Sequence, residues 1–409
     1  MHIINLTPTQ YKNYANIHKN KSFGQTLEYS NLWTNKLFLG LIDEQNNIYA
    51  AVLLIIKNIS PNIKEAIAND GFIIDYNNLN LVKTFTHELK KHLKKLKITY
   101  LITNPKFKLR EYDKHNNVIE NNASILNNLL SLGYKLNGYS NDFSKYDIVI
   151  ENKKTNTIYN TFNRNTKRNI KDSMNMGITL HKGTINDLES FYNIIKKKTN
   201  KNISYYYNLM NTYNTKDNKM DIFFTKLDPK RFLASAKKLY EKELKKNEKI
   251  YKYINKNNGR MDDKTLNKKI NSDTLLNKYK ELLNKAISFG TQYKESIIVG
   301  TCATLRNKNE IYFLIDGYNE QYRSIHSNHL LKWAIIKKYS LIKYETFNLG
   351  EIHKDYNNKN NKYHGQYQYK IGFGGNIIEY PQNLLLIINK PVYKIFEFFN
   401  KFQKQKKSI

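Results

Sequence analysis

The chain has 409 residues, more than one ordinary domain needs, and its hydrophobic content of 40% is enough for a real core. Lys and Arg total 67 against 35 Asp and Glu, a net charge of +32, which favours polyanionic partners such as nucleic acid, nucleotide-linked substrates or an anionic membrane face. The alternative is that A/T-rich coding sequence imposes the Lys and Asn excess. The single cysteine excludes an internal disulfide and a Cys-rich zinc site.

The N-terminal sequence and the apolar runs bear on localisation. "MHIINLTPTQ" lacks the apolar core of a signal peptide. The longest apolar runs, "AAVLLII" and "LLLII", have the length of strands and are too short to span a bilayer. We therefore expect a cytoplasmic protein.

Residues 1–150 alternate strand and helix patterns and are predicted to form a first domain. Two β-rich segments on either side of the turn "EQNN" predict a hairpin. Apolar residues at every fourth position from Leu81 to Leu93 form one stripe of a helix, and a strand that stops at Pro105 follows.

Residues 151–228 and 290–390 repeat this alternation and are predicted to form a second α/β domain. Its first helix is expected to run to Gly177, with an apolar face opposite a basic one. Cys302 lies in an apolar strand pattern and is expected to be a core thiol.

An insertion at residues 229–289 separates these two pieces. Its apolar residues recur at spacings of three, four or seven on both sides of the polar break "NKNNGRMDD", which predicts an antiparallel coiled-coil hairpin. At about 1.5 Å per residue, helices of about 25 residues would project about 40 Å; the alternative is a pair packed flat on the domain. The predicted seam comprises Leu233, Ala236, Tyr240, Leu244, Tyr251, Ile254, Leu266, Ile270, Leu276, Tyr279, Leu283 and Ile287.

The stretch "YQYKIGFGGN", residues 367–376, has the spacing of neither a Walker loop nor a dinucleotide fingerprint. Lys370 sits among tyrosines, and glycines follow at positions 372, 374 and 375. Such glycines permit a tight turn or the close approach of a ligand. The alternative is a surface lysine on a strand ahead of a hairpin turn.

Several segments together resemble the Fem family of tRNA-dependent peptidoglycan aminoacyltransferases. They are "INLTPTQYKNY", "FGQTLEYSNLW", "FNRNTKRNIKDSMNMGITL", the helical insertion, "YKIGFGG" and "INKPVYKIF", in the family's order. The resemblance implies an α/β (α+β) fold with two tandem Gcn5-related N-acetyltransferase-like domains and an inserted antiparallel coiled-coil hairpin. Residues 391–409 are expected to form a C-terminal helix and a basic tail.

The resemblance also implies an activity. An amino acid, with glycine favoured and alanine or serine possible, would move from aminoacyl-tRNA to the stem-peptide amine of a UDP-linked or lipid-linked peptidoglycan precursor. Aminoacyl-tRNA would be a co-substrate, and no cofactor or metal is implied. Because the donor ester is already activated, the enzyme must align the amine and stabilise an oxyanion, and it needs no nucleophile of its own.

The resemblance assigns candidate site residues. Lys370 matches a lysine implicated in transfer, and we take it as catalytic. Lys36 is slightly out of register with the family's phosphate-binding lysine, and Lys201 is the cation nearest to a missing arginine. His329 begins a helix where relatives often have tyrosine, although a structural histidine is the alternative. The substrate-binding candidates are Lys36, Lys201, Tyr205, Tyr206, His329 and Tyr369.

One departure concerns the general base. Where several relatives have Asp-Pro, this chain has Asn104-Pro105, so no carboxylate base is expected at that position. For tRNA, a basic helix face and the lysines of the insertion are expected to contact phosphates. The helix residues are Arg164, Lys167, Arg168 and Lys171.

Two other functions stay open. An acyl-CoA-dependent N-acyltransferase would have the same fold, but it needs a compact glycine-containing pyrophosphate loop before a helix, which the sequence lacks. A non-enzymatic basic RNA-binding protein with a coiled-coil partner arm would bind RNA without turnover.

Overall fold

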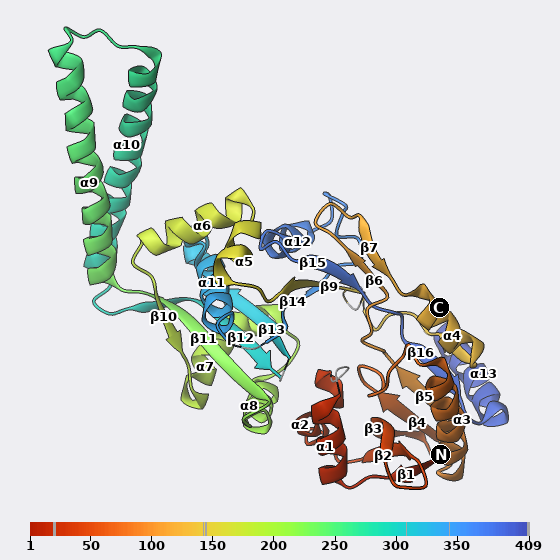
Figure 1. Cartoon of the computed structure of the whole chain (residues 1–409). Coiled ribbons are helices and arrows are strands. Elements are labelled where there is room, and N and C mark those ends of the chain that lie inside the picture. Colours follow the sequence, from red (N-terminus) through yellow and green to blue (C-terminus); the bar gives the residue numbers. More distant parts are fainter. Residues whose placement is uncertain (19–21, 142, 144, 308, 343, 407–409) are drawn as a thin grey trace.

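The structure, a computed structural model, describes residues 1–406 except 19–21, 142, 144, 308 and 343. Figure 1 shows two α/β bodies side by side and a pair of long helices that projects from one of them. The expected α/β class, with two sheet domains and an inserted antiparallel helical hairpin, is confirmed.

The first sheet has seven strands, and helices from the N-terminal part of the chain pack beside it. Its strands, in spatial order, are β1 (His2–Asn5), β2 (Lys36–Ile42), β3 (Ile48–Ser60), β4 (Ile63–Ala68), β5 (Tyr100–Thr103), β16 (Leu384–Ile387) and β8 (Tyr134–Leu136). Its helices are α1 (Pro8–Ile17), α2 (Leu27–Ser30), α3 (Leu79–Lys95) and α4 (Ala123–Ser131). The predicted stripe of α3 is buried at Phe85, Leu89 and Leu93, and the predicted hairpin is the antiparallel β2–β3 pair.

The second sheet has nine strands. In spatial order they are β10 (Thr179–Lys182), β11 (Lys219–Leu227), β12 (Ile297–Arg306), β13 (Glu310–Tyr318), β14 (Thr346–Ile352), β9 (Tyr146–Glu151), β15 (Asn376–Glu379), β6 (Arg110–Tyr112) and β7 (Val118–Asn121). Its helices are α5 (Thr155–Thr161), α6 (Arg164–Asn175), α7 (Leu188–Ile195), α8 (Ile203–Thr212), α11 (Ser327–Tyr339) and α12 (His364–Ile371). Cys302 is buried in β12, as expected.

Both sheets follow one plan. Four antiparallel strands, β1–β4 or β10–β13, are followed by a helix, α3 or α11, that crosses to a parallel neighbour, β5 or β14. The crossover is required because a tight turn cannot join parallel strands. The repeated plan agrees with the expected tandem acetyltransferase-like domains.

Each sheet is completed by a strand from the other half of the chain. β9 lies between β14 and β15 in the second sheet, and β16 lies between β5 and β8 in the first. The boundaries predicted at residues 150 and 390 do not include this exchange, because an apolar pattern identifies a strand but not its partner. The exchange ties the domains together, since separating them would break the pairing of two interior strands.

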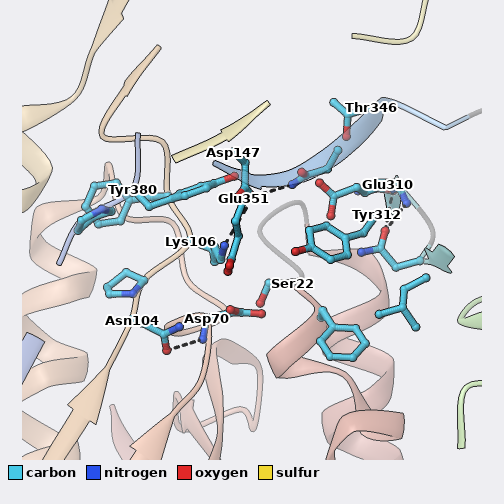
Figure 2. Close-up of a pocket in the computed structure, with 18 of the residues that line it drawn as sticks. Ser22, Asp70, Asn104, Lys106, Asp147, Glu310, Tyr312, Thr346, Glu351 and Tyr380 are labelled. Atoms are coloured by element: carbon cyan, nitrogen blue, oxygen red, sulfur yellow. Dashed lines mark hydrogen bonds and ion pairs between the residues drawn. The ribbon is translucent and has the colours of Figure 1, made fainter. Parts of the chain in front are cut away.

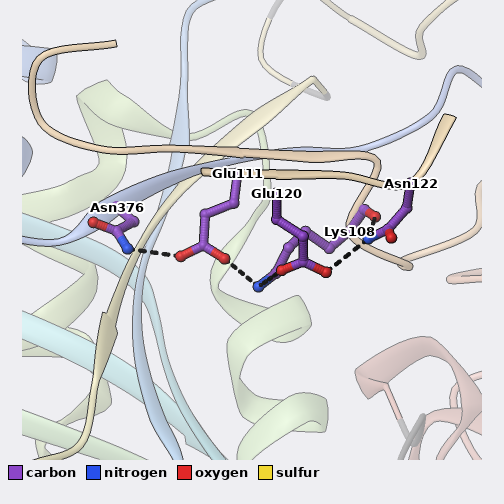
Figure 3. Close-up of polar contacts among 5 residues, drawn as sticks. All are labelled: Lys108, Glu111, Glu120, Asn122 and Asn376. Atoms are coloured by element: carbon purple, nitrogen blue, oxygen red, sulfur yellow. Dashed lines mark hydrogen bonds and ion pairs between the residues drawn. The ribbon is translucent and has the colours of Figure 1, made fainter. Parts of the chain in front are cut away.

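The β6–β7 hairpin also crosses from the first half of the chain to the second sheet. Figure 3 shows the polar contacts that hold it: Glu111 accepts a hydrogen bond from Asn376 Nδ2 at 2.6 Å and pairs with Lys108. Lys108 also pairs with Glu120 at 2.8 Å, and Glu120 accepts from Asn122 Nδ2 at 2.8 Å. These contacts link the two strands of the hairpin to each other and to β15.

The helix predicted to run to Gly177 is two helices, α5 and α6. Asn163 breaks it, because its side chain accepts the backbone N–H of Thr166 at 2.7 Å and caps α6. Ile158 and Ile170 are buried as the apolar pattern indicates, but Met174 is exposed.

The insertion forms helices α9 (Pro229–Lys256) and α10 (Asp263–Gln292), which project as expected and do not lie flat (Figure 1). The predicted seam is only partly correct, since five of its residues are exposed: Leu233, Tyr251, Leu266, Ile270 and Ile287. A polar layer occupies the middle of the interface instead, where Ser272 donates to Glu243 at 2.8 Å and Asn247 donates to Asp273 at 2.7 Å. Such a layer favours one register of a helical pair.

The C-terminal helix α13 (Lys390–Lys406) packs on the first sheet, where Val392, Tyr393 and Phe396 join a small apolar cluster with Tyr100. Among the described residues, no helix combines the length and apolarity that crossing a membrane requires.

Candidate active site

The candidate site lies where β13 and β14 separate. The two strands pair only over Glu310–Tyr312 and Thr346–Asn348. Beyond these residues they diverge, and residues of both strands line two adjoining cavities. The two cavities share the lining residues Tyr312, Leu314 and Glu351.

The larger cavity, of about 990 Å³, is rich in cations and aromatic rings, and we call it the basic cavity. Its cationic lining residues are Lys197, Lys198, Arg323, Lys332, Lys362 and Lys370. Its tyrosines and histidines are Tyr312, Tyr318, Tyr363, Tyr369, His326 and His329. Cationic side chains that bind phosphates, together with aromatic rings that stack on bases, suit a ligand that carries both groups.

Lys370 sits at the end of α12, with its Nζ donating a 2.7 Å hydrogen bond to the carbonyl oxygen of Glu351. It lies on a helix, and the alternative of a surface lysine on a strand is therefore wrong. Burial, with the nearby charge of Lys332, lowers the pKa of Lys370 to about 8. Gly350 makes room for it: φ is +82°, and a Cβ there would lie 3.3 Å from Nζ.

A buried network supports Lys370. Lys332, only 2% exposed, pairs with Asp316 at 3.1 Å, and Tyr369 donates to the carbonyl oxygen of Asn328 at 3.2 Å. Burial alone would raise the pKa of Asp316, but Lys332 and other nearby lysines lower it below its usual range. His329 packs its ring 4.8 Å from the ring of Tyr369, and burial lowers the pKa of His329 to about 4. His329 is therefore neutral at pH 7.

The smaller cavity, of about 460 Å³, lies between the two domains, and we call it the acidic cavity. Figure 2 shows Asp147 and Glu351 gathered near Lys106, with Asp70 and Glu310 also facing the cavity. Lys106 Nζ lies 3.7 Å from Asp147 Oδ2. With Glu345, five acidic residues and one lysine line the cavity, which leaves it with an acidic excess.

The pKa values of several carboxyl groups in the acidic cavity are raised. Burial, reinforced by Asp147, raises the pKa of Glu310 to about 7. Burial also raises the pKa of Asp70 and of Glu351. Desolvation opposes the charge of Lys106, yet the surrounding carboxylates outweigh it and raise the pKa of this lysine. A carboxyl group that titrates near neutrality has the proton affinity expected of a general base.

Asn104 has a positioning role in this cavity. Its Oδ1 accepts the backbone N–H of Asp70 at 3.0 Å, and Asp70 adopts φ of 60° in the turn that precedes Gly71. The carboxylate of Asp70 accepts the backbone N–H of Gly24 at 2.6 Å. Position 104 thus offers no carboxylate, as expected, but the cavity gains carboxylates from other parts of the chain.

The predicted tRNA-binding face of α6 borders the basic cavity. Asn169, on the same helix, lines that cavity and lies 3.3 Å from the ring nitrogen of His329. Arg164, Arg168 and Lys171 are exposed, and Lys167 donates to the carbonyl oxygen of Asn160 at 3.0 Å. The projecting arm contacts α6 through the middle of α10, since Lys278 pairs with Asp172 at 3.2 Å.

The remaining predicted substrate contacts lie outside the residues that line the two cavities. Lys36 donates to the carbonyl oxygen of Ser30 at 2.8 Å, and the Nζ of Lys201 lies 5.3 Å from the centre of the Tyr205 ring. Tyr206 is a core residue whose hydroxyl donates to Thr199. The structure brings Lys370, Tyr369 and His329 together, while these four residues lie elsewhere.

Sequence reasoning missed several residues of the site. They are Asp70, Lys106, Asp147, Glu310, Asp316, Lys332 and Glu351. The available signals were ionisable residues in or beside apolar strand patterns, such as Asp147 and Asp316. Lys332, within the apolar run of α11, offers the same signal. Within the described residues, no group of three or more His, Cys, Asp and Glu side chains is placed to hold a metal ion.

Comparisons with known proteins agree with this architecture. A family profile described as "FemAB family" matches residues 6–401. The chain is 26% identical over 399 residues to Aminoacyltransferase FemA of Staphylococcus epidermidis, with 91% of each chain covered. It is 23% identical to Lipid II:glycine glycyltransferase of the same species, covering 97% of this chain and 95% of the relative.

The fold comparison gives the same picture. A structure described as "Crystal structure of FemX" superposes with a TM-score of 0.75 at 17% identity, covering 97% of this chain and all of that one. At this identity the likeness concerns the fold alone.

Proposed function

The chain belongs to the FemAB family, and from this premise we propose that it transfers an amino acid from aminoacyl-tRNA to the stem-peptide amine of a peptidoglycan precursor. Like its named relatives, it is an acyltransferase. Glycine is the favoured amino acid, because one relative is named as a glycine glycyltransferase that acts on Lipid II.

One observation carries this proposal: two cavities of opposite charge meet at a single gap between strands. A polyanionic donor fits the basic cavity, and a cationic amine fits the acidic one. The residues common to both cavities, Tyr312, Leu314 and Glu351, lie where donor ester and acceptor amine would approach each other. Holding two reactants in line supplies much of the catalysis that such a transfer needs.

The donor side has the chemistry for the 3′ end of an aminoacyl-tRNA. The lysines of the basic cavity would bind its terminal phosphates, and the tyrosines would stack on its bases. The exposed face of α6 and the projecting arm would hold the rest of the acceptor stem. Lys370 faces this cavity and would stabilise the oxyanion that forms on the ester carbonyl.

The acceptor side must deliver a neutral amine. We assign Glu310, which lines the acidic cavity and has a raised pKa, as the base that takes the proton from the acceptor ammonium group. The amine nitrogen then attacks the ester carbonyl carbon, a C–N bond forms, and the bond to the tRNA 3′ oxygen breaks. The leaving 3′ oxygen takes a proton from Lys370, which lines the basic cavity, and the nitrogen gives its second proton to Lys370 as the amide forms.

The test is incubation of the full chain with tRNAs charged with glycine, alanine or serine and with either a UDP-linked or a lipid-linked precursor. Mass spectrometry should show the precursor gaining one amino acid residue, most efficiently glycine. Acetyl-CoA serves as the control donor and should give no product. Product from the acyl-CoA alone, or tRNA binding without any turnover, would contradict the proposal.

A further inference from the structure

The C-terminal helix α13 carries two apolar faces. One face attaches the helix to the first sheet, where the rings of Tyr393 and Phe396 lie 5.4 and 5.7 Å from the ring of Tyr100. Val392 packs in the same cluster. This face accounts for the attachment of the helix and leaves the other apolar face to be explained.

The second face is in contact with water. Ile395, Phe398 and Phe399 are 58%, 58% and 62% exposed, although Ile and Phe are among the residues that folded proteins most often bury. Their spacing of three and four residues places them along one stripe of the helix. A contiguous exposed apolar stripe of this kind marks an interaction surface.

The segment that carries the stripe is strongly basic. Residues 390–409 contain six lysines and one glutamate. Lys390 and Lys394 are exposed on the same helix. Long lysine side chains can place their ammonium groups at the level of lipid phosphates while neighbouring aromatic rings enter more deeply. An apolar stripe flanked by lysines is the pattern of a helix that lies in a membrane interface.

We propose that α13 docks the protein on an anionic lipid surface, with the stripe inserted between headgroups and the lysines at the phosphates. Charge complementarity favours this occupant over a second copy of the chain. Two copies would bring lysine-rich helices together on chains of net charge +32, whereas an anionic bilayer neutralises them. The inference does not require the proposed transferase activity, and vesicle binding tests it separately.

The experiment is co-sedimentation with vesicles of phosphatidylglycerol and phosphatidylcholine, compared with vesicles of phosphatidylcholine alone. The wild-type chain should bind the anionic vesicles and should be released by salt. The double variant Phe398→Ser/Phe399→Ser should lower the partition coefficient at least about tenfold. Its matched control is Leu341→Ser/Ile342→Ser, which changes another exposed apolar pair and should bind like wild type.

The electrostatic part is tested with Lys390→Glu/Lys394→Glu. Removing each lysine should cost about fivefold in partitioning, and the reversed charge should cost more. Lys216→Glu/Lys359→Glu, at exposed positions elsewhere, is the control. Circular dichroism confirms that each variant is folded. The proposal would be overturned if the wild-type chain does not bind anionic vesicles, or if the serine variant of α13 binds them like wild type. So would a lipid-free dimer that dissociates in the serine variants, because it would identify a second copy as the occupant.

Discussion

The basic and acidic cavities differ in charge although they adjoin at the same two strands, β13 and β14. The basic cavity collects lysines from α11, α12 and the segments before α8, and the acidic cavity collects carboxyl groups from both domains. Burial lowers the pKa of Lys370 to about 8 on one side and raises the pKa of Glu310 to about 7 on the other. The pKa values of a lysine and a glutamate ordinarily lie far apart, but those of Lys370 and Glu310 are close. Moving protons between such groups near neutral pH therefore costs little free energy.

Two adjoining cavities of opposite charge suit the two dissimilar substrates of the proposed transfer. A cavity selects by charge before it selects by shape, because opposite charges attract over longer distances than contacts act. If each cavity takes the substrate of opposite charge, changes in the basic cavity should weaken donor binding and the stabilisation of the transition state. Changes in the acidic cavity should weaken acceptor binding and the removal of a proton from the acceptor amine.

The largest effect is expected for Lys370→Ala. Loss of an oxyanion contact typically lowers the rate by ~10²–10³. Single-turnover transfer from pre-charged tRNA should show this loss, while precursor binding stays intact. Lys370→Arg should recover only part of the rate. Lys359→Ala, at an exposed lysine that lines neither cavity, is the control and should stay near wild type. Equal rates for Lys370→Ala and wild type would remove Lys370 from the mechanism.

Glu310→Gln should lower kcat/KM by about 10², the usual contribution of a general base. In the wild type, activity should rise with pH as this carboxyl group ionises around its pKa of about 7. In the variant, this rise of the pH–activity profile should disappear. Glu345→Gln changes another acidic residue that lines the cavity and should leave the profile unchanged. If the activity of Glu310→Gln still rises with pH in the same way, another group is the base.

Removing the basic face of α6 should weaken tRNA binding by about tenfold and reduce the dependence of binding on salt. The variant changes Arg164, Lys167, Arg168 and Lys171 to alanine. The control changes four exposed lysines of α3, in the other domain: Lys83, Lys91, Lys94 and Lys95. Fluorescence anisotropy with labelled tRNA at several salt concentrations is the measurement. Equal losses in both variants would indicate general charge attraction only.

The carboxyl group of Glu310 should also leave a mark on stability. Its pKa is higher in the folded chain than in an unfolded one, so the folded state binds more protons and the free energy of unfolding falls as pH rises from about 4.5 to about 7. Glu310→Gln should therefore be more stable than wild type at pH 8, by about 1–2 kcal/mol, and similar at pH 4. Urea unfolding at the two pH values tests this, and equal stability at pH 8 would contradict it.

The smallest effects are expected for Lys36→Ala and Lys201→Ala. Family resemblance suggests precursor contacts, but both side chains lie outside the lining of the two cavities. Changes at such positions usually cost less than about 0.5 kcal/mol, so KM for the precursor should rise by about twofold at most. A tenfold rise in either variant would extend the acceptor site beyond the acidic cavity.

The sequence predicted the elements better than it predicted their partners. The α3 stripe, the β2–β3 hairpin and the helical arm follow from local periodicity, which needs only neighbouring residues. The arm seam was partly wrong, because Glu243, Asn247 and Ser272 fill an interface in which apolar residues were expected. The division of the predicted helix at Asn163 was missed because a capping side chain interrupts a pattern that is otherwise continuous.

The fold class, the arm, the family and the place of Lys370 in a glycine-containing block were all predicted from sequence patterns. Only the tertiary structure decided that β9 and β16 exchange between the sheets, and that Asp70, Asp147, Glu310 and Glu351 share one cavity. The physical reason is distance along the chain. Periodicity records which face of an element is buried. The pKa of a buried carboxyl group depends on which charges distant segments bring beside it.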